Sequence, residues 1–346
     1  MRYARVFMDA MGEELAPVVV TTAELESRLM PLYERLRYPA GQVESMTGVL
    51  ERRFWEPGTP LWKGAREAAR KALRRSAVSP GDVEALIYAG VCRDSFEPAT
   101  ACRIAWELGV SETCAVYDVS NACLGVLNGI LEVANRIELG HIRAGLIVTC
   151  ETAREIVEST IRRMLDAASM DVFRLSLATL TGGSGAAAVV LTDGSFAREP
   201  RRRLLGGVTM TAPEHHALCR WGLEGSWEDL SVVMATDAVG VLRHGVALGV
   251  RTWRAFLGEL AWQPQDVDKV ICHQVGSAHQ QEILTALEVA EEKDFSTYPY
   301  LGNMGTASLP CTAVLAEERD FLKVGDRVGF LGIGSGLNCM MLGWEW

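Results

Sequence analysis

Four stretches of this 346-residue sequence contain residue types that could carry out acyl-group chemistry. The first places Cys123 between a short apolar stretch, 114–117, and a helical pattern that begins at Leu124. We therefore expect Cys123 at a strand-to-helix turn, where the helix dipole and unpaired backbone N–H groups favour a thiolate. This predicts a thiol pKa below the ordinary value of ~8.5. The plainer interpretation is a buried, inert cysteine.

The other three stretches lie in the second half of the chain. His273 ends a short apolar strand pattern, although a lone histidine there is more often a satisfied core residue. Asn303 stands in a turn between two glycines, where an asparagine is usually only a turn residue. A glycine loop at 332–336 contains Ser335, and its backbone amides could face an oxyanion. No helical pattern follows this loop, so it is a poor dinucleotide fingerprint.

Composition excludes several classes of protein. An apolar share of 49% and a charged share of 23% are typical of a globular protein, and a net charge of −10 makes nucleic acid an improbable partner. The nine cysteines are odd in number and lack CxxC spacing, which favours reduced thiols in the cytoplasm. There is no signal-peptide core and no apolar run of the roughly 18 residues that a membrane span needs. His215, His216 and Cys219 lack a second ligand pair, so we expect no metal site.

Strand and helix patterns alternate along most of the chain, which predicts an α/β fold with largely parallel sheets. We expect the first sixty residues to be irregular, apart from a helix that starts near Thr21. The expected strands are 83–91, 114–117, 145–150, 186–191 and the stretch that ends at 273, and the expected helices are 61–76, 99–108, 124–139 and 244–260. The polar stretch 193–203 is expected to link two halves.

An internal repeat supports this division. Residues 263–271 match 79–87 at an offset of 184 (264 − 80 and 271 − 87), and 322–327 match 138–143 at the same offset (322 − 138). A repeat this long predicts two related halves, 1–195 and 204–346, that pack with pseudo-twofold symmetry. Ligands should then bind where the halves meet, at the ends of strands.

The four stretches together resemble the thiolase superfamily, in its ketoacyl synthase III branch, over nearly the whole chain. The motifs are Asn-Ala-Cys at 121–123, His-Gln at 273–274, Gly-Asn-Met-Gly at 302–305 and Gly-x-Gly-Ser-Gly at 332–336. The resemblance implies a duplicated, five-layered αβαβα fold in which Cys123 is the acylated nucleophile. It also implies that His273 and Asn303 bind the carbonyl or enolate oxygen of the second substrate. The backbone N–H groups of Cys123 and Ser335 would form the oxyanion hole.

Glu97 stands 26 residues before the cysteine (123 − 97) and helps to decide which enzymes of the ketoacyl synthase III branch the chain resembles. A malonyl substrate forms its carbanion by losing CO₂, whereas a plain acyl thioester must lose a C–H proton and needs a base such as a carboxylate.

Four stretches resemble the OleA family: the sequence at 92–100, the cysteine motif, Gly-Ser-Gly-Leu-Asn-Cys and the terminal Trp-Glu-Trp. These enzymes condense two fatty acyl-CoAs head to head in bacterial olefin biosynthesis. The resemblance implies a homodimer in which Glu97 serves the partner's Cys123. The plainer interpretation of Glu97 is a surface acid just ahead of a helix.

Other functions stay open at this point. A decarboxylative 3-oxoacyl-ACP synthase III is the main alternative, although Gln42 and Met46 stand where such enzymes often have a Trp and an Arg that contact CoA. The residues that bind the CoA nucleotide are therefore unassigned. A 3-hydroxy-3-methylglutaryl-CoA synthase is a further option, and a degradative thiolase would need a second cysteine just before the glycine loop, whereas Cys339 follows it. A non-catalytic acyl-binding subunit would keep the same fold.

The substrates can be described only by class. We expect fatty acyl-CoA thioesters, no separate cofactor, and downstream enzymes that turn a β-keto acid into an olefin, a β-lactone or a ketone. Met164, Met170 and Phe173 are candidates for the acyl-channel wall because flexible methionine suits irregular apolar surfaces. Each could equally be ordinary core.

Overall fold

The computed structural model describes residues 1–197, 202–226, 228 and 230–346. Its strands are β1 (Phe7–Leu15), β2 (Val18–Thr21), β3 (Glu51–Phe54), β4 (Ala85–Ala89), β5 (Ala115–Val119), β6 (Ala144–Glu151), β7 (Gly185–Thr192), β8 (Arg203–Thr211), β9 (Cys219–Glu224), β10 (Ser231–Thr236), β11 (Lys269–Cys272), β12 (Arg327–Gly334) and β13 (Asn338–Glu345). Its α-helices are α1 (Thr22–Leu36), α2 (Gln42–Thr47), α3 (Leu61–Arg75), α4 (Thr100–Leu108), α5 (Gly125–Glu138), α6 (Arg154–Ala167), α7 (Met170–Ser176), α8 (Ala238–Leu260), α9 (Ser277–Leu287), α10 (Tyr298–Leu301) and α11 (Ser308–Glu318). The strands and helices expected from residue 61 onward are present, with shifted ends. None of the described helices is long and apolar enough to cross a membrane.

The main sheet repeats one topology twice. Its order is β11-β12-β13-β8-β1-β7-β6-β4-β5. From the centre outward, β1 pairs antiparallel with β7, β7 antiparallel with β6, and β6 parallel with β4. In the other direction β8 pairs antiparallel with β13, β13 antiparallel with β12, and β12 parallel with β11. The parallel pair β4–β5 has its counterpart in a single parallel bridge between Val270 and Asp294. The predicted duplication is therefore confirmed, whereas the exact boundaries at 195 and 204 stay a prediction.

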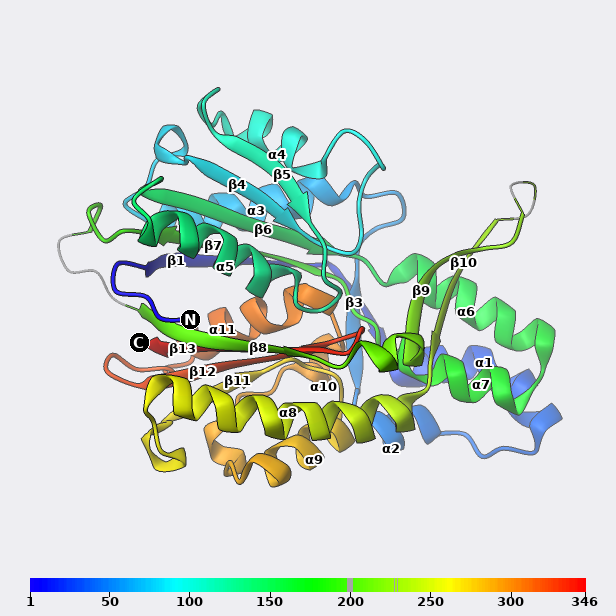
Figure 1. The fold of residues 1–346 in the computed structure, drawn as a ribbon. Helices are drawn as coiled ribbons and strands as arrows, with labels where there is room; N and C mark the ends of the chain where they lie inside the picture. Colours follow the sequence, from blue (N-terminus) through cyan, green and yellow to red (C-terminus); the bar gives the residue numbers. More distant parts are fainter. Residues whose placement is uncertain (198–201, 227, 229) are drawn as a thin grey trace.

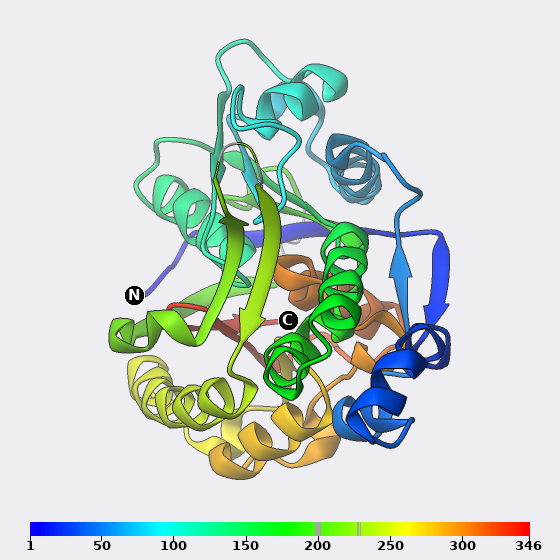
Figure 2. The same ribbon diagram turned by 90° about the vertical axis from the view of Figure 1, so that its right-hand side faces the viewer.

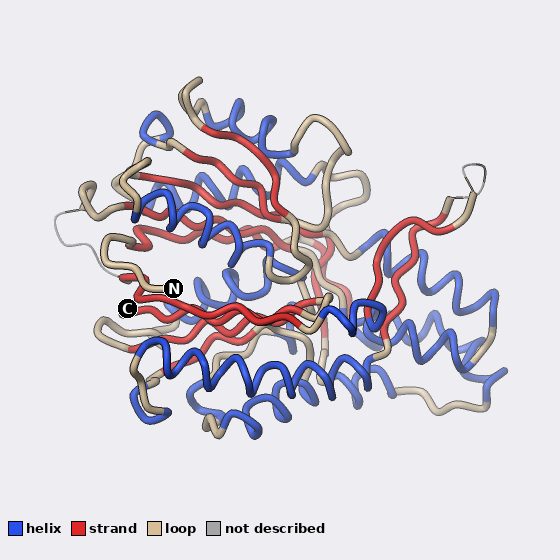
Figure 3. The backbone as a smooth tube through the Cα atoms, viewed as in Figure 1, coloured by secondary structure: helices blue, strands red, loops and turns tan. Residues whose placement is uncertain are grey.

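Helices cover both halves in five layers (Figure 1). Helices α3 and α4 cover one outer face, α5 and α11 lie between the two halves of the sheet, and α8 and α9 cover the other outer face, which Figure 3 shows as alternating helix and strand colours. Successive residues of β4 pack into different hydrophobic clusters, because side chains alternate between the two faces of a strand. Ile87 belongs to the central cluster with Ile130 of α5, whereas Leu86 and Tyr88 pack in the outer cluster with α3. This is the predicted αβαβα arrangement.

A smaller lobe stands beside the layers (Figures 1 and 2). It contains α1, α2, α6 and α7, whose apolar side chains form a cluster of their own, and the two-stranded hairpin β9–β10 lies against α6 and α7. Helix α1 begins with a capping box in which Thr21 and Glu24 bond reciprocally. The helix expected near Thr21 is thus confirmed.

The expectation of an irregular start is wrong. Residues 7–15 form β1, a central strand of the main sheet that pairs with β7 along its whole length. The polar residues Asp9, Glu13 and Glu14 interrupt the apolar pattern that would have revealed this strand. Glu13 is tolerated because Lys71 and Arg75 of α3 lie within ion-pair distance, at 3.5 and 3.7 Å. The predicted link at 193–203 lies partly outside the described residues.

The two halves join at a seam of backbone hydrogen bonds. Asn303 N–H donates to Thr181 O at 2.8 Å, and Gly183 N–H donates to Asn303 O at 2.9 Å. The chains approach so closely that a Cβ on Gly183 would stand 2.0 Å from Leu301 O. A side chain cannot fit there, so the glycine is what allows the Asn303 turn to dock.

We expect Gly183→Ala to lower the free energy of unfolding by about 1–3 kcal/mol and to disturb the Asn303 turn, because the new methyl group meets backbone rather than a movable side chain. Gly258→Ala in α8 is the matched control. Its Cβ would meet nothing within 4 Å, and alanine is the better helix former. Urea unfolding of both variants tests this, and equal stabilities would contradict it.

Candidate active site

Cys123 and Asn303 line the same cavity, of about 80 Å³. Cys123 comes from the turn before α5 in the first half, and Asn303 comes from the turn before α11 in the second half. Trp221 and Met234 of the β9–β10 hairpin complete part of the wall. The predicted meeting of the two halves around the cysteine is therefore what the structure contains.

The turn that carries Cys123 is held by the glycine loop. Ala122 has a left-handed backbone (φ 45°), and Leu124 N–H bonds to Asn121 O at 2.9 Å, so the chain reverses tightly before α5 begins at Gly125. Gly334 packs on this turn, where a Cβ would lie 3.4 Å from the Cys123 backbone nitrogen.

A chain of asparagine side chains joins the same two elements. Asn338 Nδ2 donates to Asn121 Oδ1 at 3.1 Å, and Asn121 Nδ2 donates to Asn128 Oδ1 at 2.8 Å. The loop with Ser335 thus lies beside the Cys123 backbone. The oxyanion hole formed by the N–H groups of Cys123 and Ser335 stays a prediction.

The expected fall in the pKa of Cys123 is wrong for the free protein. Burial raises the pKa of the Cys123 thiol to about 12, and the nearby Cys219 and Glu151 act in the same direction. Only a hydrogen bond from its own backbone favours the thiolate. The helix end carries about half a charge, which is too little to offset the loss of water around a thiolate at this position. Cys123 is therefore a neutral thiol at pH 7.

Asn303 is oriented by its own turn. Its Oδ1 accepts a hydrogen bond from Gly305 N–H at 3.0 Å, while its backbone is held by Thr181 and Gly183. With the carbonyl oxygen engaged, the amide NH₂ group is left to donate into the cavity. A donor at this position suits a carbonyl or enolate oxygen.

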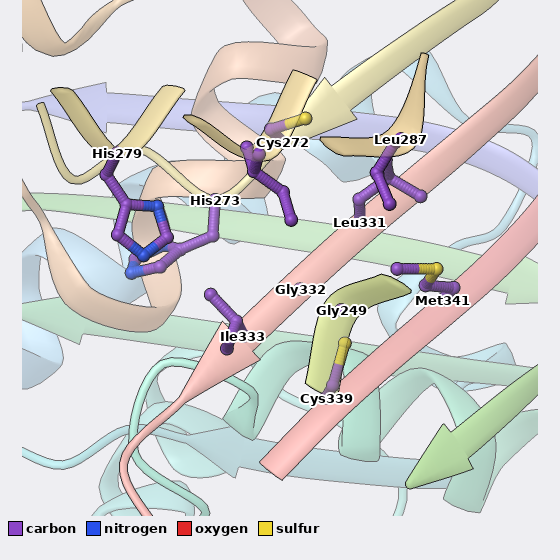
Figure 4. Close-up of a pocket in the computed structure, with 11 residues that line it drawn as sticks. Gly249, Cys272, His273, His279, Leu287, Leu331, Gly332, Ile333, Cys339 and Met341 are labelled. Atoms are coloured by element: carbon purple, nitrogen blue, oxygen red, sulfur yellow. The ribbon is translucent and has the colours of Figure 1, made fainter. Parts of the chain in front are cut away.

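His273 directly follows β11 and lines a second, smaller cavity of about 30 Å³, together with Gly332 and Ile333 (Figure 4). Burial, and then the neighbouring His279, lower the pKa of His273 to about 3, so the ring is neutral at physiological pH. Its Nδ1 has no hydrogen-bond partner among the described residues. A buried, neutral imidazole with a free ring nitrogen can form a hydrogen bond to a substrate oxygen, whereas its low pKa makes it a weak base.

The hydrogen bonds of Gln274 show why a glutamine follows the histidine in the His-Gln motif. Its Nε2 donates to Cys272 O at 2.9 Å, and its Oε1 accepts from the N–H groups of Thr297 and Tyr298 at 3.0 and 3.2 Å. The side chain thereby connects the end of β11 to the segment that leads into the Asn303 turn. Its role is to hold these two parts of the site in register.

Glu97 does not line the cavity of its own Cys123. It lies in the exposed connection between β4 and α4, beside Phe96, of which 94% is exposed. The fold therefore does not bring Glu97 into the cavity of Cys123 in the same chain.

Sequence reasoning missed Glu151. This residue ends β6, is 3% exposed, and lines the cavity together with Cys123. Burial raises the pKa of the Glu151 carboxyl to about 7, against hydrogen bonds from the Val91 and Cys92 backbones that lower it. The only signal in the sequence is an acidic residue that directly follows a buried apolar strand.

Comparisons with known proteins agree with this geometry. The acyl-CoA:acyl-CoA alkyltransferase of Shewanella oneidensis is 54% identical over 349 residues, with 100% of each chain covered. That of Xanthomonas campestris is 35% identical over 348 residues, again with 100% of each chain covered. The chain belongs to the acyl-CoA:acyl-CoA alkyltransferase (OleA) family. A family model for the C-terminal part of 3-oxoacyl-[acyl-carrier-protein] synthase III also matches residues 257–346.

Solved OleA structures have the same fold. Xanthomonas campestris OleA with one cysteine replaced by alanine superposes with a TM-score of 0.94 at 34% identity and covers 100% of this chain and 98% of that one. A form of the same OleA with serine at the cysteine, bound to lauric acid and lauroyl-CoA, superposes with a TM-score of 0.91 at 35% identity, covering 99% of this chain and 100% of that one. These superpositions confirm the thiolase-like fold that the sequence of the present chain predicts.

The predicted acyl-channel residues lie elsewhere in this OleA-family chain. Met164 and Phe173 are fully buried in the core of the smaller lobe, and Met170 packs against the same core. None of the three lines the Cys123 cavity. Their role in binding an acyl chain stays a prediction that requires this lobe to open.

We expect alkylation of Cys123 by iodoacetamide to be slow at pH 7 and to accelerate about tenfold per pH unit up to pH 9, because only the thiolate reacts and burial holds the pKa of the thiol far above neutrality. Mass spectrometry of the Cys123 peptide after timed labelling gives the rate. The exposed Cys102 peptide serves as the internal control for the reagent. A rate that levels off below pH 8 would contradict the neutral thiol.

Proposed function

We propose that this protein condenses two fatty acyl-CoA molecules without loss of CO₂. Cys123 Sγ attacks the carbonyl carbon of the first acyl-CoA, the bond to the CoA sulfur breaks, and the thiol proton leaves with the free CoA thiol. A carbanion formed at the α-carbon of the second acyl-CoA then attacks the acyl-enzyme. The new C–C bond releases Cys123 and yields a β-ketoacyl-CoA.

The observation that carries this proposal is the shared cavity of Cys123 and Asn303, in a chain related over its full length to acyl-CoA:acyl-CoA alkyltransferases. A thiol that lines the same cavity as a fixed amide donor suits acyl transfer to sulfur, because the donor can stabilise developing negative charge on oxygen. The structure of Xanthomonas OleA with lauroyl-CoA supports fatty acyl-CoA as the substrate class.

Because the Cys123 thiol is protonated at pH 7, acylation needs a proton acceptor. His273 lines a different cavity from Cys123, and its pKa of about 3 makes it a weak base, so the departing CoA sulfur is the acceptor that we assign. In the second step His273 and Asn303 would bind the thioester oxygen on which the enolate charge develops. A hydrogen bond to that oxygen lowers the barrier to removing the α-proton.

Glu97 is the base that we assign to that proton, acting from the partner subunit of a homodimer. Its exposed position on a projecting loop supports action on another chain. Solved Xanthomonas OleA forms include glutamate and cysteine variants at positions 26 residues apart (143 − 117), the same separation as Glu97 and Cys123 (123 − 97). Removing a proton from carbon, instead of CO₂, is what distinguishes this reaction from that of a decarboxylative ketoacyl synthase III.

Hydrolysis of the product thioester would release a β-keto acid and the second CoA. We infer that this acid is passed to enzymes that convert it to an olefin, a β-lactone or a ketone. No cofactor is required for any of these steps in the condensation, because the CoA thioesters supply the leaving groups.

We expect the purified protein to release CoA from a single fatty acyl-CoA, such as lauroyl-CoA, with no malonyl thioester present. Mass spectrometry should detect the condensed β-keto product or the ketone formed from it. Cys123→Ala is the control and should give neither. Activity that depends on malonyl-carrier protein would refute the proposal in favour of a decarboxylative ketoacyl synthase III.

We expect Glu97→Ala to form the acyl-enzyme at Cys123 but to condense about 10²–10⁴-fold more slowly, since a positioned general base is lost. Single-turnover mass spectrometry separates the two steps. Glu112→Ala, which also removes an exposed glutamate, should behave as wild type. Parallel loss of acylation and condensation would mean that Glu97 supports the structure instead.

A further inference from the structure

Glu151 has no role in the reaction proposed above, yet it contacts both the cavity of Cys123 and the connection that carries Glu97. Its carboxyl group lines the Cys123 cavity and packs against Gly305, two residues after Asn303. The same carboxyl accepts hydrogen bonds from the first residues of the connection that carries Glu97. Val91 N–H donates to Oε1 at 2.8 Å, and Cys92 N–H donates to Oε2 at 3.1 Å.

Two further carboxylates hold the same connection. Asp94 accepts the N–H groups of Leu61 and Trp62 at 2.7 and 3.0 Å, and Asp118 accepts those of Thr100 and Ala101, both at 3.0 Å. These two acids lie at the N-termini of α3 and α4, where free N–H groups and the helix dipole stabilise a negative charge. The connection is therefore fixed on both sides of its exposed tip at residues 95–98.

Glu151 lacks such a favourable setting. It is 3% exposed, and the groups that act on its pKa are its own burial and hydrogen bonds from Val91 and Cys92, with no cation among them in the described part of the chain. Burying an acid without a charged partner is costly. Its two oxygens nevertheless match two adjacent backbone N–H groups, a pair that an apolar residue would leave without acceptors.

We propose that Glu151 is a positioning residue that fixes the root of the loop carrying Glu97, so that Glu151 of one subunit governs condensation at Cys123 of its partner. The inference rests on the proposed function, because it takes Glu97 as the base that acts across a dimer. It adds to that function a side chain, Glu151, that connects the Cys123 cavity of a subunit to the Glu97 which the same subunit supplies to its partner.

Mixed dimers test this assignment. Two affinity tags allow purification of dimers that combine a Cys123→Ala subunit with a Glu97→Ala subunit. In this reference dimer the one competent site has Cys123 from the Glu97→Ala subunit and Glu97 from the Cys123→Ala subunit. Glu151→Gln keeps the shape of the side chain, but its NH₂ group can accept no hydrogen bond from a backbone N–H. The variant is placed in one subunit or the other.

With Glu151→Gln in the Cys123→Ala subunit, which lends Glu97, we expect condensation to fall about 10- to 100-fold below the reference dimer, since a base misplaced by about 1 Å loses rate on this scale. With Glu151→Gln in the Glu97→Ala subunit, which holds the reacting cysteine, we expect the condensation step, measured from the preformed acyl-enzyme, to stay within about threefold, because this Glu151 does not hold the loop that serves the cysteine. Acyl-enzyme formation, followed by intact mass, should be unchanged when the variant lies in the subunit that lends Glu97. Glu26→Gln, at another buried carboxylate that accepts a backbone N–H, is the matched control.

The reverse pattern would overturn the inference, because Glu151 would then act on the cysteine of its own subunit. Equal losses in both dimers, or no loss in either, would overturn it as well. If Glu151→Gln homodimers fail to form acyl-enzyme, Glu151→Asp is placed in the same two dimers and read by the same criteria. An inactive reference dimer would instead refute the cross-subunit role of Glu97, which separates failure of the proposed function from failure of the inference.

Discussion

The site depends on the burial of two acidic groups that line one cavity. The Cys123 thiol and the Glu151 carboxyl share this cavity, and burial raises the pKa of each, to about 12 and about 7. Among the described residues, no cation acts on the pKa of either group, and the Glu151 carboxylate opposes ionisation of the Cys123 thiol. The nucleophile is therefore stored as a neutral thiol.

The duplicated fold provides the geometry for this arrangement. Each half sends a turn from the end of its strands to the seam, one carrying Cys123 and the other carrying Asn303. Close backbone contact at Gly183 and the asparagine chain from Asn338 to Asn128 fix these turns relative to each other. A fixed amide donor stabilises developing charge without the reorganisation that water would need. The seam thus acts as a preorganised frame, while the surrounding helices mainly supply core.

The sequence predicted the duplicated α/β architecture and the residues with a recognisable local pattern, and it failed where tertiary contacts decide. The expectation of largely parallel sheets was wrong, because most strand pairings in the main sheet are antiparallel. The repeat at an offset of 184 predicted the two halves, and the glycine-flanked Asn303 and the turn at Cys123 were found from their neighbours. Strand β1 was missed because Glu13 and Glu14 pair with basic residues of α3, far away in sequence. The pKa of Cys123 was predicted in the wrong direction because a helix N-terminus is visible in sequence whereas desolvation is not. Glu151 was missed for the same reason: its partners at 91, 92 and 305 meet only in the folded chain.

The size of the cavity adds a constraint on how substrates enter. At about 80 Å³ it holds a few water molecules, each of which takes up about 30 Å³ in the liquid, whereas drug-sized ligands fill about 300–1,000 Å³. Two fatty acyl chains therefore require part of the wall to move. The β9–β10 hairpin contributes Trp221 and Met234 to that wall and, in the part of the chain that the structure describes, pairs with no strand of the main sheet. By contrast, the turns of Cys123 and Asn303 are fixed by the seam. Opening at the hairpin and the smaller lobe would admit acyl chains without disturbing the catalytic frame, whereas opening at the seam would dismantle it.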